Sequence, residues 1–174
     1  MTTVPVRPVE DADLPAILEI HNHAIATSTA VFDYHPHTLE MRREWLRSKQ
    51  AAGLPVLVAA VNGAVAGFAT YGPFRTRPAY KYTIEHSVYV AEPFWRRGVA
   101  RALMDALLAD ARAREYHAVI AGVVADNLPS LRFHEALGFV EVGHCREVGY
   151  KFGRWLDLKF LELILATPRA PTGP

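Results

Sequence analysis

The clearest chemical pattern in the sequence is a short basic turn, Trp95-Arg96-Arg97-Gly98-Val99-Ala100. A β-branched and aromatic segment precedes it and an amphipathic segment follows it, which predicts a strand, a tight turn and then a helix. The first N–H groups of a helix have no intrahelical acceptor, and the helix dipole adds positive potential there. Gly98 and Ala100 leave the main chain accessible, and three arginines (Arg96, Arg97 and Arg101) supply charge. The turn is therefore a candidate site for an anion such as a pyrophosphate.

A plain helix start with solvated arginines would give the same pattern, so the spacing alone leaves both interpretations open. The turn lacks the Lys-Ser/Thr pair of a P-loop and the three glycines of a dinucleotide fingerprint. Neither of those two nucleotide-binding motifs is therefore predicted here.

The histidines and the single cysteine do not form a metal-binding or nucleophile pattern. His21 and His23 are two residues apart on a predicted helix and face different directions. His35 and His37 lie in a predicted loop without a third ligand nearby in the sequence. Cys145 has no second cysteine for a disulfide and no adjacent base in the sequence. Neither a metal site nor a thiol-based ping-pong mechanism is therefore predicted.

Turn signals and hydrophobic periodicity divide the chain into the elements that must position these residues. We predict strands over residues 4–9, 56–61, 64–71, 80–90, 118–124, 139–148 and 155–165. We predict helices that begin at the caps Asp11 and Thr38, and helices over residues 98–114 and 127–137. Asn62-Gly63 is a strong hairpin signal between two of the strands. This order predicts one α/β domain with a mixed sheet over residues 1–166 and a frayed tail over residues 167–174.

Composition excludes several classes of protein. The chain has 174 residues, of which 51% are hydrophobic and 21% charged, and this fits one globular domain but not a disordered chain. A formal net charge of +1 gives no broad basic surface for nucleic acid. The sequence has neither the apolar core of a signal peptide nor a run of about 18 apolar residues. We therefore expect a cytoplasmic protein that does not bind nucleic acid or membranes.

The basic turn resembles motif A of the GNAT superfamily of acetyltransferases, a Gln/Arg-x-x-Gly-x-Gly/Ala loop that holds the pyrophosphate of coenzyme A. Gly98, Val99 and Ala100 match its last three positions, whereas Trp95 stands where Gln or Arg is usual, which affects one side-chain contact. Downstream, residues 126–130 and 134–139 resemble motif B, which ends in Leu-Gly-Phe. The resemblance implies a single-domain GNAT fold, in which a mixed, mostly antiparallel, twisted sheet of about seven strands is flanked by about four helices.

Four further segments resemble the phosphinothricin acetyltransferase family, which includes methionine sulfoximine and methionine sulfone acetyltransferases. These segments are residues 28–33, 72–80, 85–90 and 151–158, and the resemblance spans residues 4–163. It implies an acetyl-CoA-dependent N-acetyltransferase that acts on the amine of a small, amino-acid-like molecule. It also implies direct transfer of the acetyl group in a ternary complex.

The resemblance assigns catalytic roles to two residues. Glu85 stands where the family has a glutamate and is the candidate general base, either directly or through a water. A solvated strand glutamate is the alternative, and His86 is the rival base. His134 stands where many GNAT enzymes have a tyrosine that protonates the departing thiolate, and a histidine can donate that proton near neutral pH. A helix histidine without a catalytic role is the alternative.

Binding roles follow from the same resemblance. Coenzyme A is expected to contact the strand before the turn, the turn itself and the next helix start, at Val88, Tyr89, Val90, Arg96, Arg97, Gly98, Val99, Ala100, Arg101, Asn127 and Ser130. Asn127 would equally serve as a plain N-cap. The substrate is expected to contact Phe32, Arg75, Thr76, Arg77, Glu85 and His86. Arg75 and Arg77 are suited to a carboxylate and a second oxyanion, with solvated loop arginines as the alternative.

Two other kinds of function stay open at this point. The chain could acetylate protein N-termini or polyamines, although a polyamine site would favour acidic side chains over the arginines of this loop. A non-catalytic acyl-CoA sensor would need the basic turn but neither Glu85 nor His134. The family commonly forms homodimers, and we predict a homodimer here.

Overall fold

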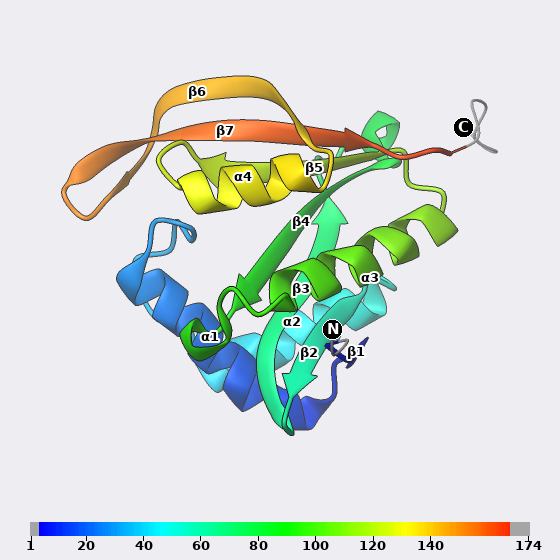
Figure 1. Ribbon diagram of the computed structural model, residues 1–174, viewed down its shortest axis with the longest axis vertical. Helices are drawn as coiled ribbons and strands as arrows, with labels where there is room; N and C mark the ends of the chain where they lie inside the picture. The colour runs from blue at the N-terminus through cyan, green and yellow to red at the C-terminus, as the bar shows by residue number, and fades with distance from the viewer. Residues whose placement is uncertain (1–3, 168–174) are drawn as a thin grey trace. The chain divides into compact units, whose positions relative to one another are not determined.

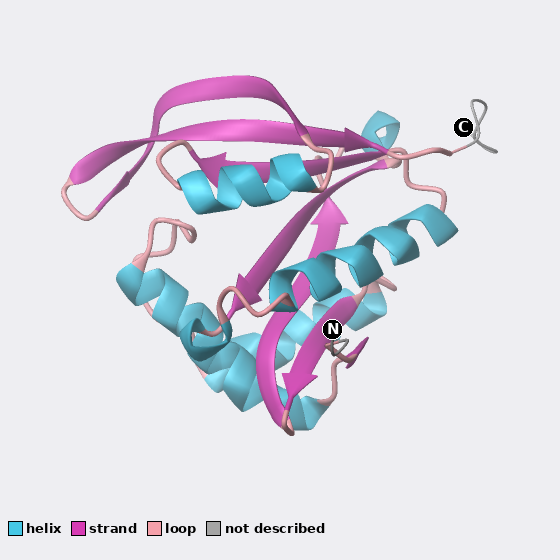
Figure 2. Ribbon diagram, viewed as in Figure 1, coloured by secondary structure: helices cyan, strands magenta, loops and turns pink. Residues whose placement is uncertain are grey.

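The computed structural model describes residues 4–167 and shows an α/β fold (Figures 1 and 2). The strands are β1 (Val6–Pro8), β2 (Val56–Val61), β3 (Ala64–Pro73), β4 (Thr83–Val90), β5 (Ala118–Val124), β6 (Val140–Lys151) and β7 (Arg154–Ile164). The helices are α1 (Leu14–Thr27), α2 (Leu39–Ala51), α3 (Val99–Ala113) and α4 (Leu128–Ala136). The strands form one sheet in the order β1-β2-β3-β4-β5-β7-β6, with β4 and β5 parallel. The predicted mixed, mostly antiparallel sheet of seven strands with four helices is confirmed over the described residues.

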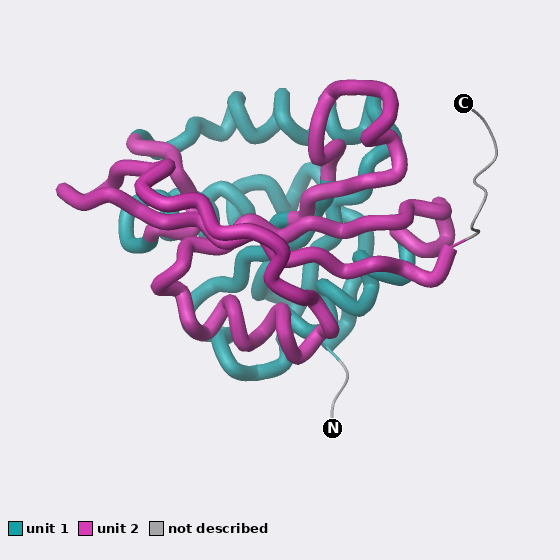
Figure 3. Tube along the Cα trace, turned by 90° about the horizontal axis from the view of Figure 1, so that it is seen from above, with its two compact units in different colours: residues 1–28, 35–71, 87–110 teal, residues 29–34, 72–86, 111–174 magenta. Residues whose placement is uncertain are grey.

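The chain divides into two compact units, which Figure 3 colours separately. Unit 1 comprises residues 1–28, 35–71 and 87–110, and unit 2 comprises residues 29–34, 72–86 and 111–174. β3, β4 and α3 each contribute residues to both units. The units are therefore parts of one domain and do not correspond to separate stretches of sequence.

In unit 1, helices cover both faces of an antiparallel arrangement of β1, β2 and β3. Ile17 and Ile20 of α1 form a buried cluster with Val58 and Phe68, and α2 contributes Trp45 to it. Successive strand residues point to opposite faces, so Gly67 faces away from Phe68. A Cβ built on Gly67 would lie 3.2 Å from Leu103 Cδ1, so α3 covers that second face closely.

In unit 2, β5, β7 and β6 lie side by side in antiparallel pairs, with α4 beside them (Figure 1). The start of β4 pairs with β5 from Thr83↔Ala118 to Glu85↔Ile120. Phe152 and Gly153 both have positive φ in the turn that joins β6 to β7, which is the geometry of a tight two-residue hairpin. Buried side chains of β5, Leu131 of α4, and Phe139 between α4 and β6 contribute to the core of this unit.

Several predicted boundaries differ from the observed ones. Asp11 is not the N-cap of α1, because residues Asp11–Asp13 form a 3-10 turn and α1 begins only at Leu14. The Asp13 carboxylate holds this turn by accepting the Glu10 N–H at 2.8 Å and two bonds from Arg7 at 2.7 and 2.8 Å. β4 begins at Thr83, because Pro78–Tyr80 form another 3-10 turn.

Other local predictions are confirmed. Thr38 caps α2 by accepting the Met41 N–H at 3.2 Å. Asn62 and Gly63 both have positive φ, as the predicted hairpin requires. The predicted tail over residues 167–174 lies outside the described residues except for Thr167.

Candidate functional site

The basic turn between β4 and α3 lies in unit 1 and has the backbone geometry of an anion site. Arg96 has φ of 60° and Gly98 has φ of 80°, so the chain reverses direction through two left-handed residues. Ala102 N–H donates to Gly98 O at 3.0 Å, which is the first hydrogen bond of the helix. The N–H groups of Val99, Ala100 and Arg101 therefore have no intrahelical acceptor and suit a phosphate oxygen.

The main chain of this turn is accessible to a ligand. A Cβ built on Gly98 would meet no atom within 4 Å, and Arg96, Arg97 and Gly98 are all exposed. The Arg97 guanidinium lies over the Phe94 ring at 5.9 Å. Arg101 bonds to both carboxylate oxygens of Asp105 at 2.9 Å through its Nε, so part of its donor capacity is used. The residues present fit a pyrophosphate held mainly by main-chain N–H groups.

Trp95, the departure from the motif, folds back onto the preceding strand. Its indole N–H donates to Val90 O at 2.7 Å, and 54% of its surface stays exposed. The indole N–H therefore uses one of the two lone pairs of the Val90 carbonyl oxygen. The expected contact of Val88, Tyr89 and Val90 with coenzyme A stays a prediction. The Tyr89 ring packs against Phe68 with centroids 5.2 Å apart.

Glu85 lies in unit 2, on one face of β4. It pairs with Ile120 of β5, and paired residues in a sheet point to the same face. The side chain is half-buried, and this burial raises the pKa of the Glu85 carboxyl, against a smaller lowering by the positive charge of Arg75. A partly desolvated carboxylate with a raised pKa is a suitable proton acceptor.

The loop after β3 brings a cation and aromatic rings to the same unit. Phe74 N–H donates to Thr83 O at 3.2 Å, and the Phe74 ring contacts Phe160 of β7 with centroids 6.4 Å apart. The Arg75 guanidinium lies over the Phe74 ring at 4.7 Å. Arg75 is exposed, its guanidinium stacks on Phe74, and its charge acts on Glu85.

The other loop residues predicted to bind substrate are exposed, as Arg75 itself is. Thr76 and Arg77 both face solvent, and Arg77 O accepts the Tyr80 N–H at 3.0 Å, which starts the 3-10 turn Pro78–Tyr80. Of the two predicted arginines, Arg75 is the one whose positive charge lowers the pKa of the Glu85 carboxyl.

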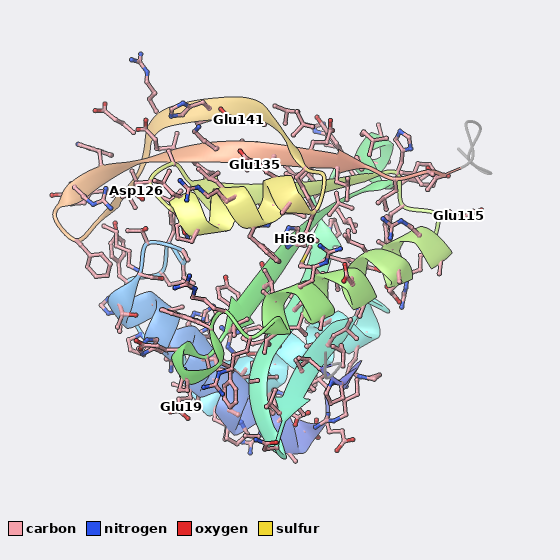
Figure 4. All side chains as sticks on the ribbon, viewed as in Figure 1. Glu19, His86, Glu115, Asp126, Glu135 and Glu141 are labelled. Atoms are coloured by element: carbon pink, nitrogen blue, oxygen red, sulfur yellow. The ribbon has the colours of Figure 1, made fainter. Side chains whose placement is uncertain are left out.

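His86 and His134 form a buried pair on the opposite face of β4 from Glu85. Their Nε2 atoms are 3.1 Å apart, and the stacked rings have centroids 5.1 Å apart (His86 is labelled in Figure 4). Phe139 packs edge-on against both rings. The two side chains are 7% and 3% exposed, so water reaches neither of them freely.

The hydrogen bonds of this pair fix where its protons lie. His134 Nδ1 is 2.7 Å from Ser130 O, and because a carbonyl can only accept, His134 carries its proton on Nδ1. His134 Nε2 is then an acceptor, and His86 donates to it through Nε2–H. His86 Nδ1 is left as a buried acceptor without a partner. Burial, with a smaller effect of His134, lowers the pKa of His86 to about 3. Burial also lowers the pKa of His134, against the opposing effect of the hydrogen bond that His134 donates to Ser130 O.

Asn127 and Ser130 form the start of α4. Asn127 Oδ1 accepts the Ser130 N–H at 3.2 Å, so the N-cap interpretation of Asn127 is confirmed. Ser130 Oγ lies 3.4 Å from His134 Nδ1. These contacts link the helix start to the histidine pair within unit 2.

Phe32 is held by β6. A Cβ built on Gly149 would lie 2.9 Å from Phe32 Cζ and 3.0 Å from its Cδ2, so the ring rests directly on the glycine main chain. Lys151 Nζ donates to Val31 O at 2.7 Å, and Tyr34 OH donates to Tyr150 O at 2.7 Å. Residues 29–34 are thus fastened at three points, and 42% of the Phe32 surface stays exposed.

Sequence reasoning missed Gly149, Lys151 and Phe74 as residues that position this region. It also missed Gly122, the exposed residue of β5, whose added Cβ would lie 3.2 Å from Glu85 Oε1. An isolated glycine in an apolar strand signals close approach to the main chain, so Gly122 could have been found. The partners of Gly149 and Phe74 are distant in sequence and gave no such signal.

Two general properties of the described residues 4–167 bear on the predictions. They contain no group of three or more His, Cys, Asp or Glu side chains arranged to hold a metal ion. Among the same residues, no helix has the length and apolar character needed to cross a membrane. The cytoplasmic location stays a prediction.

The sequence profile of the acetyltransferase (GNAT) family matches residues 17–139, which include the basic turn and the histidine pair. The chain belongs to the acetyltransferase (GNAT) family. This confirms the resemblance seen in the basic turn and in residues 126–139, and it makes the protein an acyltransferase.

Relatives of this GNAT protein match it over nearly its whole length. An L-methionine sulfoximine/L-methionine sulfone acetyltransferase from Salmonella typhimurium is 39% identical, over 95% of this chain and 97% of the relative. A phosphinothricin N-acetyltransferase from Streptomyces viridochromogenes is also 39% identical, over 97% of this chain and 91% of the relative. The structure of yncA from Salmonella typhimurium, solved with its cofactor acetyl-CoA, superposes with a TM-score of 0.94 at 38% identity, covering 99% of this chain and 100% of yncA.

Proposed function

We propose that this GNAT protein transfers the acetyl group of acetyl-CoA to the amine of a small, amino-acid-like substrate. The observation that carries the proposal is Glu85, a half-buried carboxylate with a raised pKa and the Arg75 charge acting on it. Relatives named for methionine sulfoximine, methionine sulfone and phosphinothricin support this substrate class. All three of those compounds carry an amino-acid end with one amine and one carboxylate.

In this proposal the turn before α3 holds the pyrophosphate of acetyl-CoA. The N–H groups of Val99, Ala100 and Arg101 would bind phosphate oxygens, and Arg96 and Arg97 would add charge. Acetyl-CoA supplies the reactive thioester. The accessible main chain at Gly98 supports this role, as does the relative solved with acetyl-CoA.

Glu85 would remove the proton that keeps the substrate amine from attacking. Amines of this kind have pKa values of about 8 to 10. For each unit by which the pKa exceeds the ambient pH, forming the neutral amine costs about 1.4 kcal/mol. The Glu85 carboxylate takes one proton from the ammonium, and the neutral amine attacks the thioester carbonyl. The C–N bond forms and the C–S bond breaks. The nitrogen then loses a second proton, which the departing thiolate takes up, so the products are the amide and the free thiol of coenzyme A. His86 is the weaker candidate base, because it is buried, paired with His134 and has a pKa lowered to about 3.

The general-acid role of His134 stays a prediction. In the arrangement described, its Nδ1–H bonds to Ser130 and its Nε2 accepts from His86. A proton could therefore leave His134 only after a further proton had entered the pair. Burial of both rings lowers their pKa values and makes that entry costly.

Arg75 would bind the substrate carboxylate. Its guanidinium is held over Phe74 and acts electrostatically on Glu85, so it suits a molecule that carries an amine and a carboxylate close together. Thr76 and the exposed Arg77 would contact a second oxyanion of phosphinothricin or methionine sulfoximine type. A polyamine, which has no carboxylate, would gain nothing from these arginines.

A panel assay tests the proposed function. Release of thiol from acetyl-CoA is measured with phosphinothricin, methionine sulfoximine, methionine sulfone, spermidine and a peptide with a free N-terminus. We expect release with at least one of the three amino-acid analogues and little with the polyamine. Release with the peptide or spermidine alone would favour the alternative enzymes. Coenzyme binding without release from any amine would favour an acyl-CoA sensor.

We also propose that the protein is a homodimer. Tyr150, Phe152 and Trp155 surround the turn between β6 and β7 and are 49%, 57% and 60% exposed. Clustered exposed aromatic side chains are typical of protein interfaces. Light scattering should give the mass of a dimer for the wild type and of a monomer for Trp155→Glu. A monomeric wild type at micromolar concentration would refute the proposal.

A further inference from the structure

Gly122 interrupts the buried strand β5 with exposed main chain. The other six residues of β5 are buried, whereas Gly122 is exposed. Gly122 lies two residues beyond Ile120, which forms the last of the pairs that join β5 to β4. Gly122 is thus an accessible position of β5, two residues beyond the partner of Glu85.

The space that a side chain at position 122 would fill lies beside the Glu85 carboxylate. A Cβ built on Gly122 would be 3.2 Å from Glu85 Oε1 and 3.9 Å from both methyl carbons of Leu158. The first distance is tighter than ordinary van der Waals contact, so a methyl group would press on the carboxylate. The glycine therefore keeps this space open to another molecule.

The surroundings of Gly122 combine an anion, a cation and apolar groups. Gly122 pairs with Phe160 of β7, so these two residues share a face of the sheet with Ile120 and Glu85. The Phe74 ring contacts Phe160, and Arg75 lies over Phe74. A carboxylate, a guanidinium and apolar groups around an exposed glycine suit an α-amino acid with an uncharged apolar portion.

We propose that the reacting end of an α-amino acid substrate lies on the exposed main chain of Gly122, between Glu85 and Leu158. The inference rests on the proposed function and adds the place of the substrate. The ammonium lies within reach of the Glu85 carboxylate, and the carboxylate lies toward Arg75. The apolar part of the substrate contacts Leu158 and Phe160.

A comparison of two alanine variants tests this inference. Gly122→Ala adds a methyl group beside Glu85. Gly143→Ala is the matched control, because Gly143 lies in β6, which β7 separates from β5, and its added Cβ would meet only Phe160 Cβ, at 4.0 Å. For each chain, kcat and KM are measured with the best amino-acid analogue of the panel, and Kd for acetyl-CoA is measured by calorimetry.

We expect Gly122→Ala to lower kcat/KM for the amino acid by about tenfold or more, because small displacements at a reacting centre are costly. Acetyl-CoA affinity should be unchanged, and Gly143→Ala should match the wild type in both measurements. A Gly122→Ala enzyme with wild-type kinetics would overturn the inference and leave the proposed function intact. A wild type that acetylates no amino acid would overturn both.

A second measurement covers the case in which Gly122→Ala does not fold. Glycine-labelled wild-type protein of 19.3 kDa is suited to NMR, and the Gly122 Hα signals can be assigned. With coenzyme A and a bound amino-acid analogue, nuclear Overhauser contacts should join Gly122 Hα to the substrate α-proton. Contacts of that proton with other residues but not with Gly122 would contradict the inference.

Discussion

At the scale of the residue, the environment of Glu85 decides whether it can act as a base. Burial raises the pKa of its carboxyl, and the Arg75 charge lowers it by a smaller amount. The folded-state pKa therefore lies above the usual 4.5, and Glu85 accepts a proton more readily than an exposed carboxylate. The same carboxylate lies on the opposite face of β4 from His86, so the two candidate bases cannot act at one position.

The substitution Glu85→Gln should remove the base and keep the shape. We expect kcat to fall by roughly 10²- to 10⁴-fold, the usual range for loss of a general base, with unchanged Kd for acetyl-CoA. In the wild type, kcat/KM should fall as pH falls through the raised pKa of Glu85, so this acidic limb should lie above 4.5. A Gln variant that keeps wild-type kcat and the same acidic limb would exclude Glu85 as the base.

The histidine pair should make stability depend on pH. Below its ordinary pKa of 6.5 a histidine of the unfolded chain takes up a proton, whereas buried His86 stays neutral until about pH 3. The free energy of unfolding should therefore decrease as pH falls from 6.5 toward 3, by about 1.4 kcal/mol per pH unit for each such histidine. At a pH above 6.5 these histidines are neutral in both states, so they do not make the free energy of unfolding depend on pH.

Urea denaturation between about pH 7 and pH 5 measures this dependence for the wild type and for His134→Gln. The glutamine oxygen can still accept from His86 Nε2–H, and all carboxylates are the same in the two chains, so their contributions cancel. The slope should be smaller in the variant, since burial also lowers the pKa of His134 in the wild type. Equal slopes would show that His134 is not held neutral by burial.

At the scale of the element, the turn before α3 depends on backbone conformation as much as on its arginines. Gly98 has φ of 80°, a region that side chains rarely adopt, and its position is open to a ligand. Gly53, which follows α2, has φ of 65° and is equally open. The two glycines lie at different places in the chain, but both need a positive φ.

Gly98→Ala and Gly53→Ala should therefore lower the free energy of unfolding by similar amounts, about 1–2 kcal/mol each. Only Gly98→Ala should weaken acetyl-CoA binding, because its strained turn moves the N–H groups of α3. Calorimetric titration with acetyl-CoA and thermal unfolding measure the two effects separately. Equal coenzyme affinity in both variants would show that this turn is not the phosphate site.

The contact between residues 29–34 and β6 can be tested by stability. Gly149→Ala would press a methyl group into the Phe32 ring, whereas Gly143→Ala on the same strand would make only an ordinary van der Waals contact with Phe160 Cβ. Overpacking of this kind typically costs about 1–3 kcal/mol, so Gly149→Ala should be less stable than Gly143→Ala in urea denaturation. Equal stabilities would mean that Phe32 does not rest on Gly149 in solution.

At the scale of the whole molecule, sequence patterns predicted the element order and the fold. Continuous apolar runs predicted β2 and β5 at their observed bounds, and Asn62-Gly63 located a hairpin. The predicted start of α1 at Asp11 was wrong, because Asp13 forms the contacts that hold the chain before the helix. Local sequence cannot indicate such a contact, since it depends on Arg7 reaching Asp13.

The candidate site could be predicted only in part, because some of its contacts join residues that are distant in the sequence. Glu85, Arg75 and the Gly98 turn were identified from residue types and from the family resemblance. The engagement of His134 with His86, across 48 positions of sequence, follows from tertiary packing that no local pattern encodes. The same holds for Gly149 beneath Phe32 and for Phe74 on Phe160.

Transfer of a labelled acetyl group is the most direct test of the central claim. The purified protein is incubated with ¹³C-acetyl-CoA and methionine sulfoximine, and the product is examined by mass spectrometry and NMR. The account predicts a labelled amide on the α-amine, formed by the wild type and strongly reduced with Glu85→Gln. An unlabelled α-amine after incubation with the phosphinothricin and methionine analogues, from a protein that binds acetyl-CoA, would contradict it.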